Sequence, residues 1–452
     1  MRSKIMKFFF GTYVRGFVVS YLLFLFFGAF MLMLPVSIQD GQSLSLVDAV
    51  FVSVSGMSTT GLTTIVVKDT FTAFGQTVLA FILQFGGIGL IMFVAIFWLL
   101  IGKKINFRER TMIMQDQNQL GRNGIVRFIK NVLLMIITIE LIGFLTMGTY
   151  LFLSGYFDFK QAYFQAFFLT ISMFTNAGFD ISPTSSLFMY KNDYFMQTLA
   201  MVLMFLGAVG FWPLVELKEK IKAKRNKQEY EFSLFAKILV FAHLGLWLVS
   251  ALMVFLIEYN DFLVDKSFFE GLYYCLFMSL TTRNAGFATM DMNNFTNTTQ
   301  VFFGILMFIG SSPNSAGGGI RTTTLLMTIL GIRAFAKGKE QVVIKNKAIK
   351  PDAIYKSLIV FIGAITLIIT ALFVMTISEP FTIQQLFFEI ASAFGTTGLS
   401  LGITPDLSLI GKIVLIVVMF IGRIGILALL LMFRGKGTSN NIKYPEIDMI
   451  VG

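Results

Sequence analysis

Charged residues are scarce in this chain. Asp, Glu, Lys and Arg together make up 13% of its 452 residues, whereas a soluble domain has about 25%. Hydrophobic residues reach 56%, and the mean hydropathy is +0.77. This composition excludes an ordinary soluble protein and predicts an all-α integral membrane protein, because in lipid a helix satisfies its own backbone hydrogen bonds.

Cysteine and histidine are almost absent. Cys275 is the only cysteine, so no internal disulfide can form. His243 is the only histidine, which excludes a metal site built from several histidines. We interpret both as buried packing residues, with a pH sensor as the alternative for His243.

Enzyme motifs are missing as well. The sequence has no Walker A motif, no His-Glu-x-x-His, no nucleophile elbow in a credible context, and no Gly-x-Gly-x-x-Gly fingerprint after a strand. We therefore expect a protein that is not an enzyme and that holds no cofactor of its own.

Basic residues give the chain a net charge of +11, and they cluster. Of the 36 Lys and Arg residues, 28 lie in five hydrophilic segments: before Phe17, in 102–130, 216–237 and 333–356, and after Phe433. Surplus Lys and Arg mark the cytoplasmic side of a membrane protein, so the charge does not indicate nucleic acid. We expect a multi-pass protein of the plasma membrane with both termini in the cytoplasm.

Four matching quarters follow one another along the chain. Each has a long apolar helix, a shorter apolar run, a glycine stretch and a second long apolar helix. The first helices are predicted at Phe17–Leu34, Val132–Leu153, Ile238–Ile257 and Ser357–Ile377. The second helices are predicted at Phe74–Ile101, Phe195–Val215, Gln300–Phe335 and Leu409–Phe433.

The shorter runs are too short to cross a membrane. They are Leu46–Ser58, Gln161–Thr175, Phe268–Thr282 and Ile383–Gly395. A helix of this length cannot cross a hydrocarbon core of about 30 Å, and both flanking helices start and end on the basic side. We therefore predict eight transmembrane helices and four pore loops that enter from the outer face, arranged with pseudo-fourfold symmetry around one ion pore.

This pattern divides the chain into repeats and connecting segments. The repeats are 1–101, 132–217, 237–335 (whose second helix is broken) and 356–433. The cytoplasmic segments are 102–131, 218–236, 336–355 and the tail 434–452.

One glycine closes each short run, and the four glycines are 117, 108 and 112 residues apart. The stretch ends in Thr-Thr-Gly-Leu in repeats one and four and in Asn-Ala-Gly-Phe in repeats two and three. Glycine can take the conformations that turn consecutive carbonyls inward, and rings of carbonyls can replace the hydration shell of a small cation. The alternative, that these are ordinary glycines of membrane helices, does not explain their four matching places. The predicted ion-binding residues are Thr59, Thr60, Gly61, Asn176, Ala177, Gly178, Asn284, Ala285, Gly286, Thr396, Thr397 and Gly398.

The second helix of the third repeat is interrupted by a proline, three successive glycines and several small polar residues. Such a segment at membrane depth should line a cavity, and we interpret it as a mobile gate, with a passive bend as the alternative. Arg423 of the fourth repeat could hold the loop's carbonyls, or it could pair with Glu389. Arg283 is expected to brace its own pore loop. The predicted gate residues are Gly310, Ser312, Pro313, Asn314, Gly317, Gly318, Gly319, Arg321 and Arg423.

These four glycine loops, with one filter glycine per repeat, resemble the membrane subunit of the Trk/Ktr/HKT superfamily of potassium transporters, and the eight spans resemble its KtrB/KtrD type. The resemblance implies potassium uptake through a gated, channel-like pore, with sodium dependence in many members and an intramembrane gating loop. It further implies a homodimer on a cytosolic ring of RCK subunits that bind ATP, ADP or NAD. The alternatives are the channel-like subunit of a potassium-pumping ATPase and a non-conducting, ion-binding membrane receptor.

Overall fold

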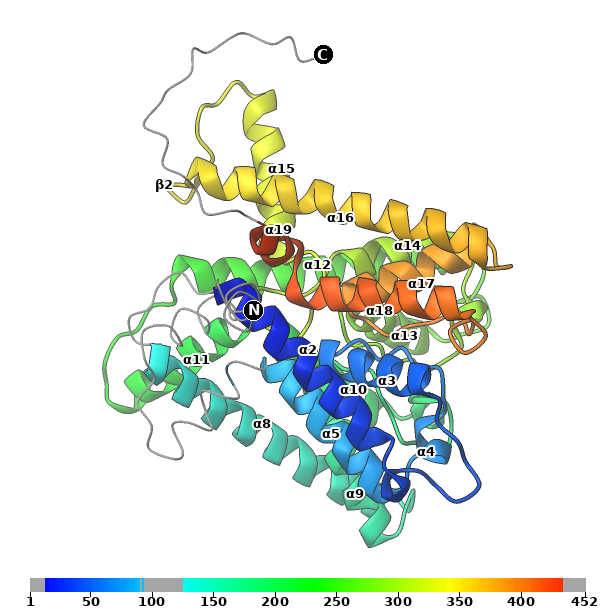
Figure 1. Cartoon of the computed structure of the whole chain (residues 1–452). Helices are drawn as coiled ribbons and strands as arrows, with labels where there is room; N and C mark the ends of the chain where they lie inside the picture. The colour runs from blue at the N-terminus through cyan, green and yellow to red at the C-terminus, as the bar shows by residue number, and fades with distance from the viewer. Residues whose placement is uncertain (1–12, 90–91, 93–124, 434–452) are drawn as a thin grey trace, which may run out of the picture.

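The computed structural model describes residues 13–89, 92 and 125–433, and within them the regular secondary structure is almost entirely helical (Figure 1). The predicted segment 102–131 lies largely outside the described residues, and the predicted tail 434–452 lies wholly outside them. The first quarter contains α2 (Tyr13–Leu32), α3 (Leu46–Ser58), α4 (Val67–Thr70) and α5 (Ala73–Ile88). The second contains α8 (Ile125–Leu153), α9 (Phe159–Phe174), α10 (Tyr194–Ala208) and α11 (Phe211–Arg225).

The other two quarters follow the same order. The third contains α12 (Leu234–Glu258), α13 (Phe268–Thr281), α14 (Asn297–Phe308) and α15 (Thr322–Ala336). A small hairpin of β1 (Val343–Ile344) and β2 (Lys347–Ala348) leads to the fourth, which contains α16 (Pro351–Ser378), α17 (Ile383–Gly395), α18 (Leu409–Ile424) and α19 (Ile426–Phe433). Three single-turn 3-10 segments complete the order, at Pro35–Ser37, Phe188–Tyr190 and Met292–Asn294.

The four short helices α3, α9, α13 and α17 start in the same way. Each is preceded by a Ser, Thr or Asp whose side chain accepts a hydrogen bond from an amide of the first turn, at Ser45, Asp158, Ser267 and Thr382. Such caps satisfy amides that have no partner within the helix. Helices α3 and α17 begin and end at the residues predicted from the sequence.

Two of the second helices are broken where the sequence predicted continuity. Helices α10 and α11 meet at 102°, and α18 and α19 meet at 94°. The breaks fall at Gly210 and Gly425, whose φ angles of +99° and +88° lie outside the helical region. The predicted continuous helices Phe195–Val215 and Leu409–Phe433 were therefore wrong, and the segment 218–236, predicted as a loop, is helical as far as Arg225.

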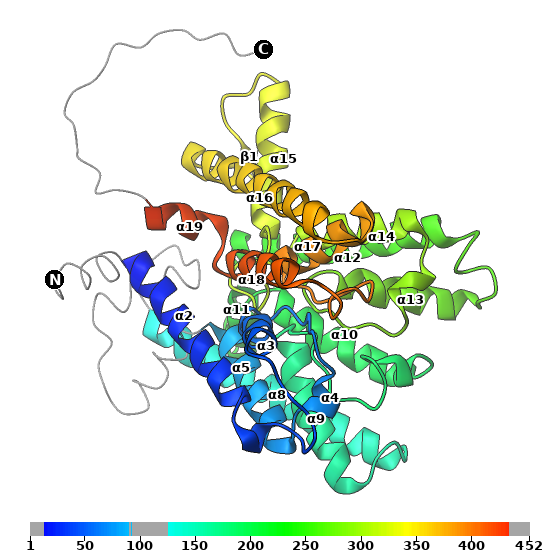
Figure 2. The same cartoon turned by 45° about the vertical axis from the view of Figure 1, so that its right-hand side comes forward.

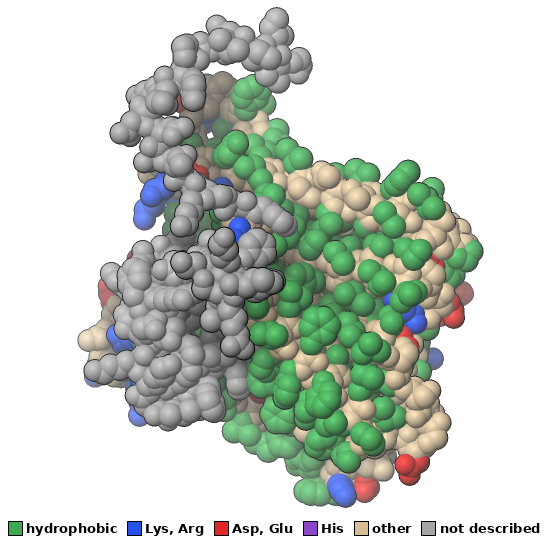
Figure 3. Space-filling view, viewed as in Figure 1, with side chains coloured by type: hydrophobic (Ala, Val, Ile, Leu, Met, Phe, Trp, Pro, Cys, Tyr) green, Lys and Arg blue, Asp and Glu red, His purple; other side chains and the backbone are tan. Residues whose placement is uncertain are grey.

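Three helices in the described part are long and apolar enough to cross a membrane, namely α8, α12 and α16. Two more spans are possible if each bent pair is counted as one. Figure 3 shows a broad hydrophobic surface over the helices, with acidic and basic side chains gathered along its edges. The surface suits lipid, whereas the total of eight spans stays a prediction.

Candidate ion pathway

The short helices all end in the same unusual backbone. The residue two before each filter glycine has a positive φ, between +52° and +76°, at Thr59, Asn176, Asn284 and Thr396. The glycines have φ of +98°, +67°, +74° and +96°, at Gly61, Gly178, Gly286 and Gly398. Two left-handed residues around one ordinary residue turn the chain back on itself, which is costly unless glycine occupies the tighter position.

The four glycines form a closed ring. A Cβ atom added to any of them would meet the carbonyl oxygen that precedes the next glycine around the ring. The pairs are Gly61 with Ala177, Gly178 with Ala285, Gly286 with Thr397, and Gly398 with Thr60. The stretches therefore follow one another around the ring in chain order, and the approach is closest at Gly61, Gly286 and Gly398, where an added Cβ would lie within 2.6 Å of the carbonyl oxygen.

Serine hydroxyl groups on the last turn of the short helices form hydrogen bonds with the backbone of the filter loops. Ser55 and Ser392 accept hydrogen bonds at 3.0 Å from the amides of Gly61 and Gly398. Ser172 donates at 2.6 Å to the carbonyl of Phe179, just beyond the second glycine. These serines were not among the residues predicted from the sequence, although each stands six residues before its glycine.

Glu389 supports the filter loop of the fourth repeat. It is fully buried, and its carboxylate accepts hydrogen bonds from the Ser400 hydroxyl (2.5 Å), the Leu401 amide (3.1 Å) and the Thr404 hydroxyl (2.8 Å). Both oxygens therefore have partners on the loop itself, and Glu389 does not need Arg423, the partner that the sequence offered as an alternative.

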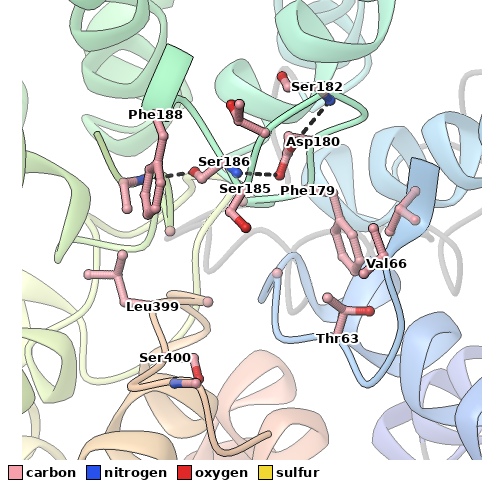
Figure 4. Close-up of a pocket in the computed structure, with 18 of the residues that line it drawn as sticks. Thr63, Val66, Phe179, Asp180, Ser182, Ser185, Ser186, Phe188, Leu399 and Ser400 are labelled. Carbon is pink, nitrogen blue, oxygen red and sulfur yellow. Dashed lines mark hydrogen bonds between the residues drawn. The ribbon is translucent and has the colours of Figure 1, made fainter. Parts of the chain in front are cut away.

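A cavity of about 560 Å³ opens over the glycine ring, lined by all four filter glycines (Figure 4). Three carboxylates also line it, Asp69, Asp180 and Asp291, together with Lys68. Asp180 accepts hydrogen bonds from the amides of Ser182 (3.0 Å) and Ser186 (3.1 Å). Burial raises the pKa of Asp180 to about 7, and these hydrogen bonds oppose the shift. A cavity with a surplus of carboxylates favours cations at the mouth of the ring.

The segment 309–321 lies against the opposite side of the ring. Thr59 donates to the carbonyl of Ala316 (2.8 Å), and Thr396 accepts from the amide of Gly318 (2.7 Å). Asn284 donates to the carbonyls of Gly318 and Gly395. Three of the four filter loops thus contact the predicted gate directly through their left-handed residues.

The segment 309–321 also forms hydrogen bonds with residues near the α10–α11 and α18–α19 breaks. The amides of Ser312 and Ala316 donate to the carbonyls of Ala208 (3.1 Å) and Gly207 (3.2 Å), at the end of α10. The amide of Phe211, the first residue of α11, donates back to the carbonyl of Asn314 (2.6 Å). From the fourth repeat, the carbonyl of Gly422 accepts from Gly319 (3.1 Å). This part of the second repeat was not among the gate residues predicted from the sequence.

Arg423 joins three repeats. Its guanidinium donates to the carbonyls of Ala316, in the gate segment, and Gly86, in α5, and to the Thr59 hydroxyl at 3.2 Å. A planar fork with several fixed donors suits such an arrangement, whereas a lysine has one point of charge.

Two more arginines hold the ends of the segment. Arg321 donates to the carbonyls of Ser312 (3.4 Å) and Gly317. Arg283 is buried and donates to the carbonyl of Gly310 (2.9 Å), so it connects its own pore loop to the gate segment. The structure thus brings the predicted filter and gate residues together in one region. Among the residues that it describes, no group of three His, Cys, Asp or Glu could hold a metal ion.

A fold of apolar helices, a closed ring of glycine loops and a cavity with a surplus of carboxylates over that ring suit a membrane cation transporter. The family of the TrkH type, described as "Cation transport protein", matches residues 16–443, and the chain belongs to that family. It is accordingly a transporter and not an enzyme.

Similar proteins support the same family. The chain is 44% identical to the "Ktr system potassium uptake protein D" of Bacillus subtilis over 422 residues, covering 93% of each chain. It is 33% identical to the "Ktr system potassium uptake protein B" of the same organism, covering 100% of this chain and 99% of that one. It is 31% identical to the "Potassium/sodium uptake protein NtpJ" of Enterococcus hirae, covering 97% of both. The crystal structure of TrkH from Vibrio parahaemolyticus matches with a TM-score of 0.68 and 20% identity, over 92% of this chain and 84% of that one, and shows the shared fold.

Proposed function

We propose that this protein takes up potassium across the plasma membrane through the glycine ring. The observation that supports this best is the closed ring, in which every filter glycine lies against a carbonyl of its neighbour. Such carbonyls can take the place of water around a dehydrated cation. The four stretches act as the selectivity filter of a pseudo-fourfold pore, with potassium as the substrate.

We further propose that the segment from Gly310 to Arg321 is the gate. Its contacts with Thr59, Asn284 and Thr396 support this role because each of these residues stands two positions before a filter glycine. Arg423 holds the gate closed and adds positive charge beside the path, which raises the barrier for cations.

Regulation and assembly follow the relatives. We propose sodium-dependent uptake, a homodimer, both termini in the cytoplasm, and control by a cytosolic RCK ring that binds ATP, ADP or NAD. The names of the relatives, potassium uptake proteins of Ktr systems and a potassium/sodium uptake protein, support a partner subunit and a role for sodium.

The test is ion flux through purified protein in liposomes. We expect rubidium influx that potassium inhibits much more strongly than sodium does, and that changes when the neighbouring cytosolic subunit and its nucleotide are added. A protein that binds potassium but shows no flux under any of these conditions would instead be an ion-binding receptor.

A further inference from the structure

Helix α11 leaves the helical bundle sideways. It meets α10 at 102° and runs beside the start of α8 (Figures 1 and 2). If α10 crosses the membrane, as proposed above, α11 must run close to the membrane plane on the cytoplasmic side. Its first turns are buried in the protein, through residues that include Leu214, Val215 and Glu216, and Ala223 is buried further along.

Beyond this buried start, the exposed side of the helix combines apolar and basic side chains. Leu217 and Ile221, one helical turn apart, are 44% and 63% exposed. Exposed basic residues flank them on both sides, at Lys220, Lys222, Lys224 and Arg225.

The acidic residues of α11 accept hydrogen bonds from other residues of the protein. Glu216 is buried and accepts hydrogen bonds from Ser233 at the start of α12. Glu219 accepts from the Tyr230 hydroxyl at 3.3 Å. The exposed face of α11 is therefore cationic around a small apolar centre.

We propose that this face binds the headgroups of anionic phospholipids in the cytoplasmic leaflet. Leu217 and Ile221 insert at the boundary between headgroups and acyl chains, while the basic side chains contact lipid phosphates. Two apolar side chains are few for a stable protein partner, which needs about 800 Å² on each side.

The lipid face is connected to the gate through the first residue of the same helix. Gly210 lies against the carbonyl of Pro313, and the Phe211 amide donates to the carbonyl of Asn314. Lipid that holds α11 in the membrane plane therefore stabilises the arrangement in which the gate segment lies across the ring. This coupling rests on the proposed function and on the proposed orientation, whereas lipid binding itself does not require transport. Anionic lipid should slow ion flux.

The experiment compares two triple variants in two readouts. The test variant is K220Q/K224Q/R225Q, and the control K337Q/K339Q/K347Q removes three exposed basic residues near the β1–β2 hairpin. Native mass spectrometry counts retained phosphatidylglycerol against phosphatidylcholine, and rubidium flux is measured in liposomes of phosphatidylcholine with and without phosphatidylglycerol.

For the wild type and the control we expect preferential retention of phosphatidylglycerol and slower flux when it is present. The test variant should retain phosphatidylglycerol about a hundredfold more weakly, and its flux should no longer respond. Raising the salt concentration should weaken retention by the wild type, independently of any variant.

Equal phosphatidylglycerol retention by the test variant and the wild type would overturn the proposal. So would loss of binding to the cytosolic subunit with unchanged lipid retention, because the face would then serve a protein partner. If lipid retention responds as expected but no protein conducts rubidium, the lipid site stands and the transport proposal fails.

Discussion

Alanine at each filter glycine should impair transport to a different degree. A Cβ on Gly178 would lie 3.1 Å from the carbonyl oxygen of Ala285, a distance that a small shift can relieve. On Gly61 it would lie 2.6 Å from Ala177, and on Gly286 and Gly398 it would lie closer still to a carbonyl oxygen. The ring therefore tolerates one substitution much better than the other three.

The magnitudes follow from two costs. A left-handed backbone costs an alanine about 1–2 kcal/mol at any of the four positions. Overpacking adds about 1–3 kcal/mol where the neighbouring carbonyl must move. Since each 1.4 kcal/mol is about tenfold in affinity, Gly178→Ala should weaken the apparent potassium affinity by about 5- to 30-fold. Gly286→Ala should weaken it by about a hundredfold or more and reduce the preference for rubidium over sodium.

The assay is rubidium uptake with sodium competition, in cells that lack other potassium uptake and in liposomes. Gly155→Ala is the matched control, because its φ of +73° nearly equals the +74° of Gly286 and no atom lies within 4 Å of its added Cβ. It carries the backbone cost without the carbonyl contact. Wild-type selectivity in Gly286→Ala, or a loss of uptake in Gly155→Ala as large as that in Gly286→Ala, would refute the role of the carbonyl contact.

Three further predictions concern the proposed gate and the acidic cavity over the ring. Deleting 312–318 should raise flux in the absence of any cytosolic subunit, and an unchanged or lower flux through folded protein would contradict the gate. Arg423→Gln should likewise raise basal flux several-fold. Arg423→Lys should not restore the wild-type level, because one ammonium cannot reach the carbonyls of both Ala316 and Gly86. Equal flux in both variants and the wild type would argue against Arg423 holding the gate closed. The pKa of Asp180 is raised from 3.8 to about 7, so its negative charge appears as the pH rises through 7, and the apparent potassium affinity should increase between pH 6 and 8. The same raised pKa lowers the stability of the folded state above about pH 4. Asp180→Asn should flatten the profile of affinity against pH, and a profile identical to the wild type would rule out Asp180 as its source.

Local patterns were sufficient for the parts of the fold that depend on neighbours in the chain. The limits of α3 and α17 follow from an N-cap, a short apolar run and a terminal glycine, all within about 15 residues. The breaks at Gly210 and Gly425 were less predictable, because a glycine does not always interrupt a helix. Gly207, only three residues before Gly210, lies within α10. A glycine permits a bend, but packing around it decides whether the bend occurs.

By itself, the sequence determined the class of protein, the places of the four filter glycines and the presence of an interrupted helix. Those features depend on composition and on backbone freedom, which act locally. Only the tertiary structure decided that Asn284 reaches Gly395, that Arg423 joins Gly86 to Ala316, and that α11 is tied to Asn314. These partners stand about 100 to 340 residues apart, and their contacts exist because four similar units pack around one ring, which no local pattern encodes.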